Sequence, residues 1–336
     1  MEIKNSISKL LNREDLSEKE AIFFIDSLAL GKINSSQIAA VLTLLKIKGE
    51  STGEVLGLIK GMRKYMVSIN HRDLCIDTCG TGGDGANTFN ISTITALVVA
   101  GVGVKVAKHG NRAASGKCGS ADILEELGAN ISLDSKKAEE ILNDLNFTFL
   151  FAPLYHPVMK ILSPIRKDLS FPTVFNYIGP FLNPAKVKRQ IIGVASISTA
   201  KKLAEAAKHL GYEYLLIISS KDGLDEISLG EKTEGYEIKG TKMKKIIIDP
   251  SRLGFKKSPL KNIQTKSIEE NKKILTDILN GKHGDCRDVV LVNSAYALLV
   301  SGKSQTLKEA LQLASESIDS GKALKVLNKF IQGSNQ

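Results

Sequence analysis

The chain has 336 residues, of which 43% are hydrophobic, so it is long enough to hold more than one hydrophobic core. It contains no run of about 18 apolar residues and no apolar segment after Met1, which argues against a membrane span and a signal peptide. The formal net charge of +10 suggests an anionic partner, but the lysines are dispersed and are not interleaved with aromatic residues, which argues against nucleic acid. The cysteines have no metal-ligand spacing and are interpreted as reduced thiols of a cytoplasmic protein: Cys75, Cys79, Cys118 and Cys286.

Residues 1–66 have a helical pattern. Ala21, Phe24, Ile25 and Leu28 recur at helical spacing, and two further apolar faces follow at 37–45 and 55–66. The loops between these segments are short, which predicts a small helical bundle. None of these segments carries a group of residues suited to catalysis.

Residues 73–128 contain the strongest chemical signal. An apolar run at 74–76 leads into Gly80, Gly82, Gly83 and Gly85, and a helical segment at 94–100 and a strand-like segment at 104–107 follow. Glycines let backbone N–H groups converge on a ligand, and the N-terminus of the next helix adds a positive dipole end. Potential N-cap residues precede that helix, namely Asn90, Ser92 and Thr93. The unit predicts a phosphate site, with a tight structural turn as the alternative.

The acid inside this loop, Asp84, limits the classes of ligand that the loop could bind. Gly80, Gly82 and Gly85 match the dinucleotide spacing, but polar residues separate them from the helix and no Asp or Glu occurs between Gly85 and Asp122. The loop also lacks the lysine of a P-loop. Asp84 would repel a phosphate unless a divalent cation or a ligand hydroxyl lay between them. We therefore expect a polyanionic ligand that carries hydroxyl groups and binds with magnesium.

The following segments alternate between helix and strand. A helix is expected at 134–145 and a strand at 147–151, and His156 and then Arg166 follow. By position alone, His156 is as consistent with packing as with function. Strands at 190–194 and 214–219 flank a helix at 199–210, which predicts a mainly parallel sheet with flanking helices.

A second acidic loop follows the strand at 214–219. Asp225 and Glu226 lie beside a glycine turn and could hold a hard cation together with substrate phosphates, although such a loop could also be solvated surface. We expect this loop to be exposed. A strand pair at the sheet edge is predicted at 236–248, and helices are predicted at 267–279, 288–300, 306–317 and 322–330.

Four sequence blocks together resemble the anthranilate phosphoribosyltransferase family over nearly the whole chain. The blocks are Gly80-Thr-Gly-Gly-Asp84, Asn90-x-Ser92-Thr93, Lys108-His-Gly-Asn-Arg112 and Gly119-Ser-Ala-Asp-x-Leu-Glu-x-Leu-Gly128. The resemblance implies an α/β fold with a small discontinuous helical domain, residues 1–70 together with about 164–184. A larger, mainly parallel-sheet phosphoribosyl-binding domain would comprise residues 71–163 and 185–336, with the ligand cleft between the two.

The resemblance implies an activity and its partners. The family transfers the 5-phosphoribosyl group from phosphoribosyl pyrophosphate to the amine of anthranilate, with Mg²⁺ as cofactor, in tryptophan biosynthesis. A homodimer through the helical domain is expected, and association with an anthranilate synthase amidotransferase is left open. The alternatives are a pyrimidine nucleoside phosphorylase and a non-catalytic nucleic-acid-binding paralogue.

The resemblance also assigns residues to roles. It places Lys108 and His109 in catalysis and Ser92, Asp225 and Glu226 at the metal. The phosphoribosyl pyrophosphate site would comprise Gly80, Thr81, Gly82, Gly83, Asp84, Thr88, Asn90, Ser92, Thr93, Lys108 and Ser120. The anthranilate site would comprise Gly80, His109, Asn111, His156 and Arg166. One departure is the run Ser220-Lys221-Asp222, where many family members have a histidine.

Overall fold

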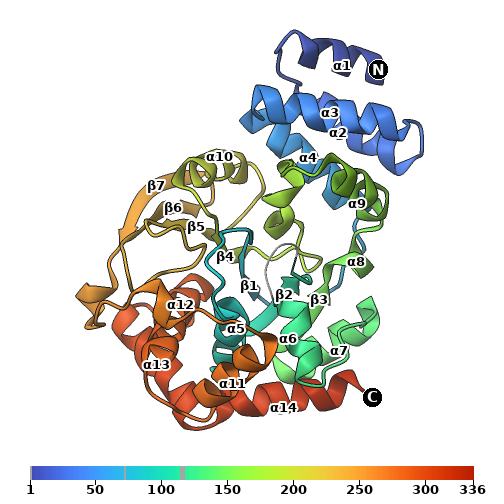
Figure 1. The fold of residues 1–336 in the computed structure, drawn as a ribbon. Coiled ribbons are helices and arrows are strands. Elements are labelled where there is room, and N and C mark those ends of the chain that lie inside the picture. Colours follow the sequence, from blue (N-terminus) through green and yellow to red (C-terminus); the bar gives the residue numbers. More distant parts are fainter. Residues whose placement is uncertain (1, 72, 114–117) are drawn as a thin grey trace.

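The computed structural model describes residues 2–71, 73–113 and 118–336. Four helices form its upper, blue part (Figure 1), one more than the segments read from the sequence. Capping boxes at Ser17, Asn34 and Ser51 fix where the last three begin, because each side chain accepts a hydrogen bond from the backbone three residues on. The helices are α1 (Ile3–Leu11), α2 (Glu18–Ala29), α3 (Ser35–Lys48) and α4 (Thr52–Tyr65).

Within the described residues, seven strands form one sheet in the order β3-β2-β1-β4-β5-β6-β7. The first five pair in parallel and the last two pair antiparallel at one edge, so both the mainly parallel sheet and the edge strand pair are confirmed. The strands are β1 (Cys75–Gly80), β2 (Lys105–Gly110), β3 (Phe147–Phe151), β4 (Arg189–Gly193), β5 (Tyr214–Ser220), β6 (Thr233–Lys239) and β7 (Lys242–Ile248).

Strand β1 lies at the point where the strand order reverses. It pairs with β4 from Ile76 to its end at Gly80, but with β2 only at Cys75 and Ile76. Beyond Ile76 the two strands therefore separate. In open parallel sheets, ligands bind outside the carboxyl ends of the strands at such a reversal.

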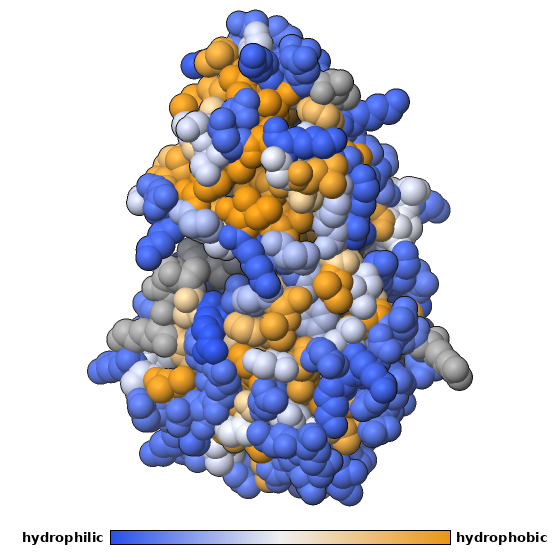
Figure 2. All heavy atoms as spheres, turned by 90° about the vertical axis from the view of Figure 1, so that its right-hand side faces the viewer, coloured by the Kyte–Doolittle hydropathy of each residue, from blue (hydrophilic) through white to orange (hydrophobic). Residues whose placement is uncertain are grey.

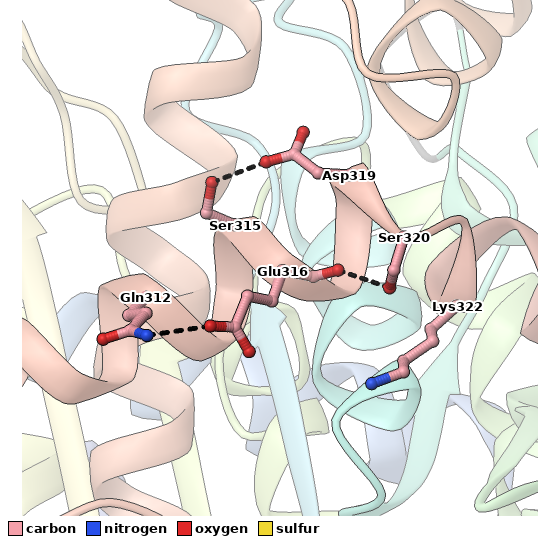
Figure 3. Close-up of a pocket in the computed structure, with 6 residues that line it drawn as sticks. All are labelled: Gln312, Ser315, Glu316, Asp319, Ser320 and Lys322. Carbon is pink, nitrogen blue, oxygen red and sulfur yellow. Dashed lines mark hydrogen bonds between the residues drawn. The ribbon is translucent and has the colours of Figure 1, made fainter.

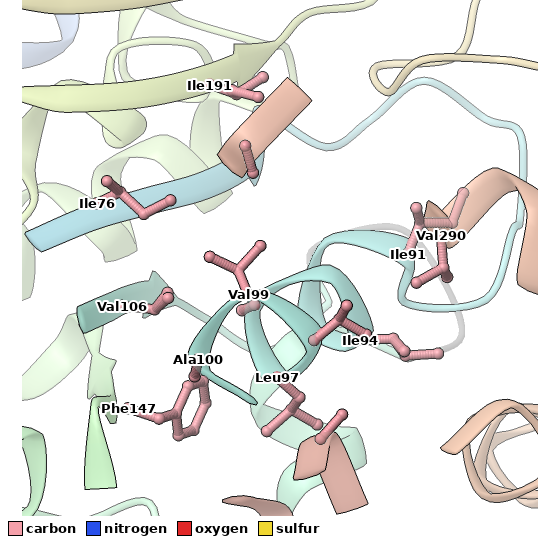
Figure 4. Packing of buried hydrophobic residues seen from close by; sticks show 14 of the residues in the cluster. Ile76, Ile91, Ile94, Leu97, Val99, Ala100, Val106, Phe147, Ile191 and Val290 are labelled. Atoms are coloured by element: carbon pink, nitrogen blue, oxygen red, sulfur yellow. The ribbon is translucent and has the colours of Figure 1, made fainter. Parts of the chain in front are cut away.

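One face of the sheet is covered by a helix that is buried almost all round. In α5 (Ile91–Gly101), nine of the eleven residues are buried, and Figure 4 shows Ile94, Leu97 and Val99 among the side chains of that core. The helices packed on the same core are α6 (Ser120–Glu126), α7 (Ser135–Leu145), α11 (Ile268–Leu279), α12 (Asp285–Ser301), α13 (Leu307–Asp319) and α14 (Lys322–Ser334). The helices predicted in the C-terminal segment are thereby confirmed.

The other face of the sheet joins the helical part. Ile191 lies in the first core and its neighbour Ile192 in a second core, because successive strand residues point to opposite faces. The second core unites α1–α4 with α10 (Ile197–Ala207) and α9 (Pro157–Leu169), which follows the short α8 (Ala152–Tyr155). It also includes side chains of the 3-10 turns η1 (Val174–Asn176) and η2 (Gly179–Leu182). The predicted domain boundaries stay a proposal.

The surface of the sheet edge and that of the C-terminal helices each have one further feature. On the edge strand β7, the exposed Lys245 forms an ion pair with Glu234 of β6 at 2.9 Å. A hollow on α13 and α14 is lined by Gln312, Ser315, Glu316, Asp319, Ser320 and Lys322, several of them hydrogen-bonded to one another (Figure 3). Ser317, on the same helix, donates to Val98 O in the last turns of α5, so this hollow lies at the opposite end of α5 from the strand ends. Among the described residues, no helix is both long enough and apolar enough to cross a membrane.

Candidate active site at the carboxyl ends of the strands

The glycine loop leaves the end of β1 in a conformation that only glycine adopts readily. Gly82, Gly83 and Gly85 have φ angles of 70°, 74° and 70°, where a side chain would be strained. Thr81 N donates to Gly193 O at 2.9 Å, which ties the start of the loop to the end of β4. Gly82 and Gly83 are exposed, so the loop presents its backbone to solvent at the switch point.

The acidic loop after β5 packs directly beneath the glycine loop. A Cβ on Gly80 would overlap the Asp225 carboxylate, and one on Gly193 would overlap the Asp225 carbonyl. Gly82 N donates to Asp225 Oδ2 at 2.8 Å. Asp225 is therefore only 8% exposed, and the expectation of a solvent-exposed acidic loop is wrong. This burial was not predictable from the acidic loop itself, because it depends on two glycines from other strands.

The carboxylates of Asp84, Asp225 and Glu226 lie close together at this point, and their negative charges repel one another. Burial, followed by the charge of Asp84, raises the pKa of Asp225 well above its usual range. Burial, followed by the charge of Asp225, raises the pKa of Glu226 in the same way. A divalent cation beside them would offset both effects, since an opposite charge favours the ionised form.

The donor set fits magnesium. Carboxylate and hydroxyl oxygens are the ligands of a hard cation, and Asp225, Glu226 and Ser92 provide them. Among the described residues, no three His, Cys, Asp or Glu side chains are placed to enclose a metal ion alone. A magnesium ion here would take its other ligands from substrate phosphates and water, as is usual for this metal.

Lys108 occupies the centre of the arrangement. It lies on β2, is 1% exposed, and its Nζ donates to Thr78 O at 2.9 Å and to Ser92 Oγ at 3.1 Å. The buried ammonium thus spans the gap between β2 and β1 and reaches the start of α5. It brings positive charge to the region in which the glycine loop and the α5 N-terminus converge.

The start of α5 differs in detail from the expectation. Asn90 is at the N-cap position, but its side chain makes no capping bond. Instead its Oδ1 accepts from Asn271 Nδ2 at 2.8 Å, and its Nδ2 donates to Cys118 O at 3.2 Å. Thr93 is buried and its Oγ1 has no hydrogen-bond partner. Sequence reasoning missed Asn271, which lies 181 residues from Asn90 and has no local signal.

Three further predicted residues lie around this region. Thr88 forms an isolated bridge with Gln264. Ser120 begins α6, and its Oγ donates to Asn111 O at 3.4 Å. Asn111 is exposed, just beyond the end of β2. Residues 114–117, within the segment 73–128 singled out above, lie outside the described residues.

Two histidines form a buried pair beside Lys108. His109 Nε2 and His156 Nε2 are 3.1 Å apart, and the ring centroids are 5.0 Å apart. Burial lowers the pKa of His156 to about 4 and, with the charges of His156 and Lys108, lowers the pKa of His109 well below its usual range. Both rings are neutral at pH 7, with one Nε2 donating to the other. His156 Nδ1 is buried with no partner.

Arg166 lies in the last turn of α9, the helix that begins just after His156. Its Nη2 donates to Asn176 Oδ1 at 2.9 Å, and its Nε is buried with no partner. Burial lowers the pKa of the guanidinium. An unpaired buried donor is costly, so Arg166 Nε and His156 Nδ1 are groups that a polar ligand could satisfy.

The fold defines the broad class of the chain. Residues 4–66 match the model of the helical bundle domain of a glycosyl transferase family, and residues 72–324 match the model of its α/β domain. The chain is thus a member of this glycosyl transferase family.

Relatives narrow the assignment. The anthranilate phosphoribosyltransferase of Methanobrevibacter smithii is 43% identical over 99% of both chains. The crystal structure of the Thermus thermophilus enzyme is 35% identical, covers 98% of this chain and 99% of its own, and has a TM-score of 0.91. The Saccharomyces cerevisiae enzyme, solved in complex with phosphoribosyl pyrophosphate and magnesium, is 30% identical, covers 99% of this chain and 98% of its own, and has a TM-score of 0.89. The chain belongs to the anthranilate phosphoribosyltransferase family. These relatives support the transferase interpretation and not the two alternatives.

The buried histidine pair predicts a pH-dependent stability. The pKa of His156 is about 4 in the folded state against about 6.5 unfolded, so the unfolded state binds more protons between these values and stability falls as the pH falls. Between pH 7 and pH 5, His156 should remove about 2 kcal/mol of unfolding free energy. Urea unfolding at both pH values should show this loss in the wild type and a smaller one in His156→Gln. The exposed His209→Gln is the control, and an equal loss in His156→Gln and wild type would contradict the assignment.

Proposed function

We propose that the chain transfers the 5-phosphoribosyl group from phosphoribosyl pyrophosphate to the amine of anthranilate, releasing pyrophosphate. The observation that carries this proposal is that two chemically different groups lie at the carboxyl ends of the strands. An acidic loop that requires a cation lies under the glycine loop, and a neutral histidine pair lies beside Lys108. The yeast relative was solved with phosphoribosyl pyrophosphate and magnesium, and separately with 4-fluoroanthranilate, which supports one site for each substrate.

The donor substrate would bind between the glycine loop and the start of α5. Backbone N–H groups of the loop and of the helix N-terminus suit its phosphate oxygens. The full set assigned to the donor is Gly80, Thr81, Gly82, Gly83, Asp84, Thr88, Asn90, Ser92, Thr93, Lys108 and Ser120. Asp84 would accept a ribose hydroxyl or a metal-bound water rather than meet a phosphate directly.

Magnesium would be held by Ser92, Asp225 and Glu226. When bound, it neutralises charge on the pyrophosphate as that group leaves. The run Ser220-Lys221-Asp222 maintains this loop without the histidine common in the family. Asp222 Oδ2 accepts from Ser228 Oγ at 2.5 Å, and Lys221 pairs with Glu234 at 3.2 Å.

The acceptor would lie on the histidine side, against Gly80, His109, Asn111, His156 and Arg166. The planar fork of Arg166 suits a benzoate carboxylate, and its Nε is unpaired. The amine of anthranilate is neutral at pH 7, so attack requires alignment more than proton removal. The neutral His109 then acts as a positioning group or weak base, and Lys108 stabilises charge that develops on the donor side.

Three further assignments complete the proposal. The protein works in the cytoplasm, in tryptophan biosynthesis. It forms a homodimer through α1–α4. Association with an anthranilate synthase amidotransferase stays a prediction.

Activity should require both the donor and magnesium. Loss of anthranilate fluorescence should occur with phosphoribosyl pyrophosphate and Mg²⁺ together and should stop on addition of a chelator.

The double variant Asp225→Asn, Glu226→Gln should lose most activity and recover part of it at high magnesium, because the carboxylates lower the dissociation constant of the metal. Turnover that persists with chelator would contradict the metal assignment, and no turnover under any condition would contradict the proposed function.

Replacing Arg166 should separate the two substrates. Arg166→Ala should cost about 2–4 kcal/mol in anthranilate kcat/KM, or roughly 30- to 1,000-fold, because a charge-assisted bidentate contact is lost. The KM of phosphoribosyl pyrophosphate should change little, and Arg166→Lys should restore activity only in part. A two-substrate kinetic grid, with circular dichroism as the folding control, tests this. A rise in the donor KM alone would place Arg166 at the phosphates.

The homodimer should depend on the apolar surface of the helical part. Figure 2 shows apolar side chains gathered there, and Leu11, Leu30 and Ile47 are 65%, 59% and 67% exposed. Ile47→Asp should shift the molar mass measured by light scattering from dimer to monomer, because a buried unpaired charge is costly at an interface. Ile247→Asp on β7, at a position 61% exposed, is the matched control and should stay dimeric. A monomeric wild type would refute the homodimer.

A further inference from the structure

A buried asparagine lies where β1 and β2 separate. The last paired residues of the two strands are Ile76 and Val106. The next residue is Asp77 on β1 and Ala107 on β2, and the side chain of Asn183 bridges these two. Asn183 Nδ2 donates to Asp77 Oδ2 and to Ala107 O, each at 2.8 Å. The side chain thus connects the two strands at the position where the next backbone hydrogen bonds of the β1–β2 pair would be expected.

The amide of Asn183 is fully used by the protein. Its two N–H groups go to Asp77 and Ala107, and its Oδ1 accepts from Ala185 N at 2.8 Å. The residue is only 3% exposed. Since the donors of an asparagine amide number two, none is left for a ligand. Any effect of Asn183 on the reaction must act through the backbone that it holds.

That backbone carries both halves of the site. Gly80 follows Asp77 by three residues on β1, and Lys108 and His109 follow Ala107 directly on β2. The bridge is therefore placed immediately before the donor loop on one strand and before the acceptor residues on the other. A change in its length would move one half of the site relative to the other.

The bridge is anchored on its far side as well. Asp77 Oδ2 also accepts from Gln190 Nε2 at 3.2 Å, and Gln190 Oε1 accepts from Tyr212 OH at 2.9 Å. Arg63, from α4, donates to Tyr212 OH at 3.3 Å. Asp77 and Gln190 are fully buried, so these bonds are made in a region without solvent, where the groups have little freedom to rearrange.

We propose that Asn183 is a positioning residue that sets the distance between the donor loop and the acceptor residues by bridging Asp77 and Ala107. It stands on the segment that returns from the helical part, so the same side chain connects that segment to both strands. The inference rests on the proposed function, because it concerns the alignment of that reaction. Misplacement of reacting groups by about 1 Å costs on the order of 100-fold in rate.

The test is a kinetic comparison of Asn183→Ala and Asn183→Asp with the wild type. Asn183→Ala removes both donors, whereas Asn183→Asp keeps the volume and the acceptor for Ala185 but turns a carboxyl toward Asp77, so neither variant restores both bonds of the bridge. The two are measured together so that a folded variant remains if one of them does not fold. We expect kcat per folded enzyme to fall about 10- to 100-fold while both KM values stay within about threefold. Wild-type kcat in a folded variant, or a rise in one KM with kcat unchanged, would overturn the inference.

Two controls distinguish positioning from general stability. Ser317→Ala removes another buried hydrogen bond, from Ser317 Oγ to Val98 O, and should lower Tm without changing kcat. The exchange variant Asp77→Asn, Asn183→Asp restores a donor between the two side chains and should raise kcat above that of Asn183→Asp alone. Recovery of Tm without kcat would overturn the inference. A wild type without turnover would instead refute the proposed function.

Discussion

The contact between the Asp225 loop and the ends of β1 and β4 is the constraint on which the site depends. It exists only because Gly80 and Gly193 have no side chains, so the loop reaches the strand backbone and Gly82 N reaches the carboxylate. A carboxylate held in this way has little freedom to move away from Asp84 and Glu226. The fold therefore concentrates negative charge at the place where a metal–phosphate complex would relieve it.

The charge distribution divides the site into two chemically different sides. Acids lie under the glycine loop, the buried ammonium of Lys108 lies between the strands, and neutral imidazoles lie beyond it. Burial favours the neutral form of both kinds of group, so it raises the pKa of the acids and lowers the pKa of the histidines. A divalent cation would compensate for burial only on the acidic side. The histidine side stays neutral, which suits an aromatic acceptor with an uncharged amine.

How much of this the sequence predicted depends on how local each signal is. The glycine loop, Lys108 and His109 lie in one continuous stretch. The residue types of the loop alone predicted a phosphate site, and the roles of Lys108 and His109 followed from the family resemblance. The strands and most helices followed from periodicity. The burial of Asp225, the bond of Asn90 to Asn271 and the bridge made by Asn183 were not predictable, because each joins segments that are distant in the sequence. Their partners are chosen by strand order, which periodicity does not determine.

The separation of the site residues along the chain also constrains how the protein is made. Gly82 and Asp225 touch although they are 143 residues apart in the sequence. At a synthesis rate of about 5–20 residues per second, Gly82 leaves the ribosome roughly 7–30 s before Asp225 does. During that interval the glycine loop has neither β4 nor the acidic loop to define it, and closing so long a segment is slow. The contact between Gly82 and Asp225 thus cannot form until more than half of the chain has been synthesised, and until then β1 has an unpaired edge toward the position of β4.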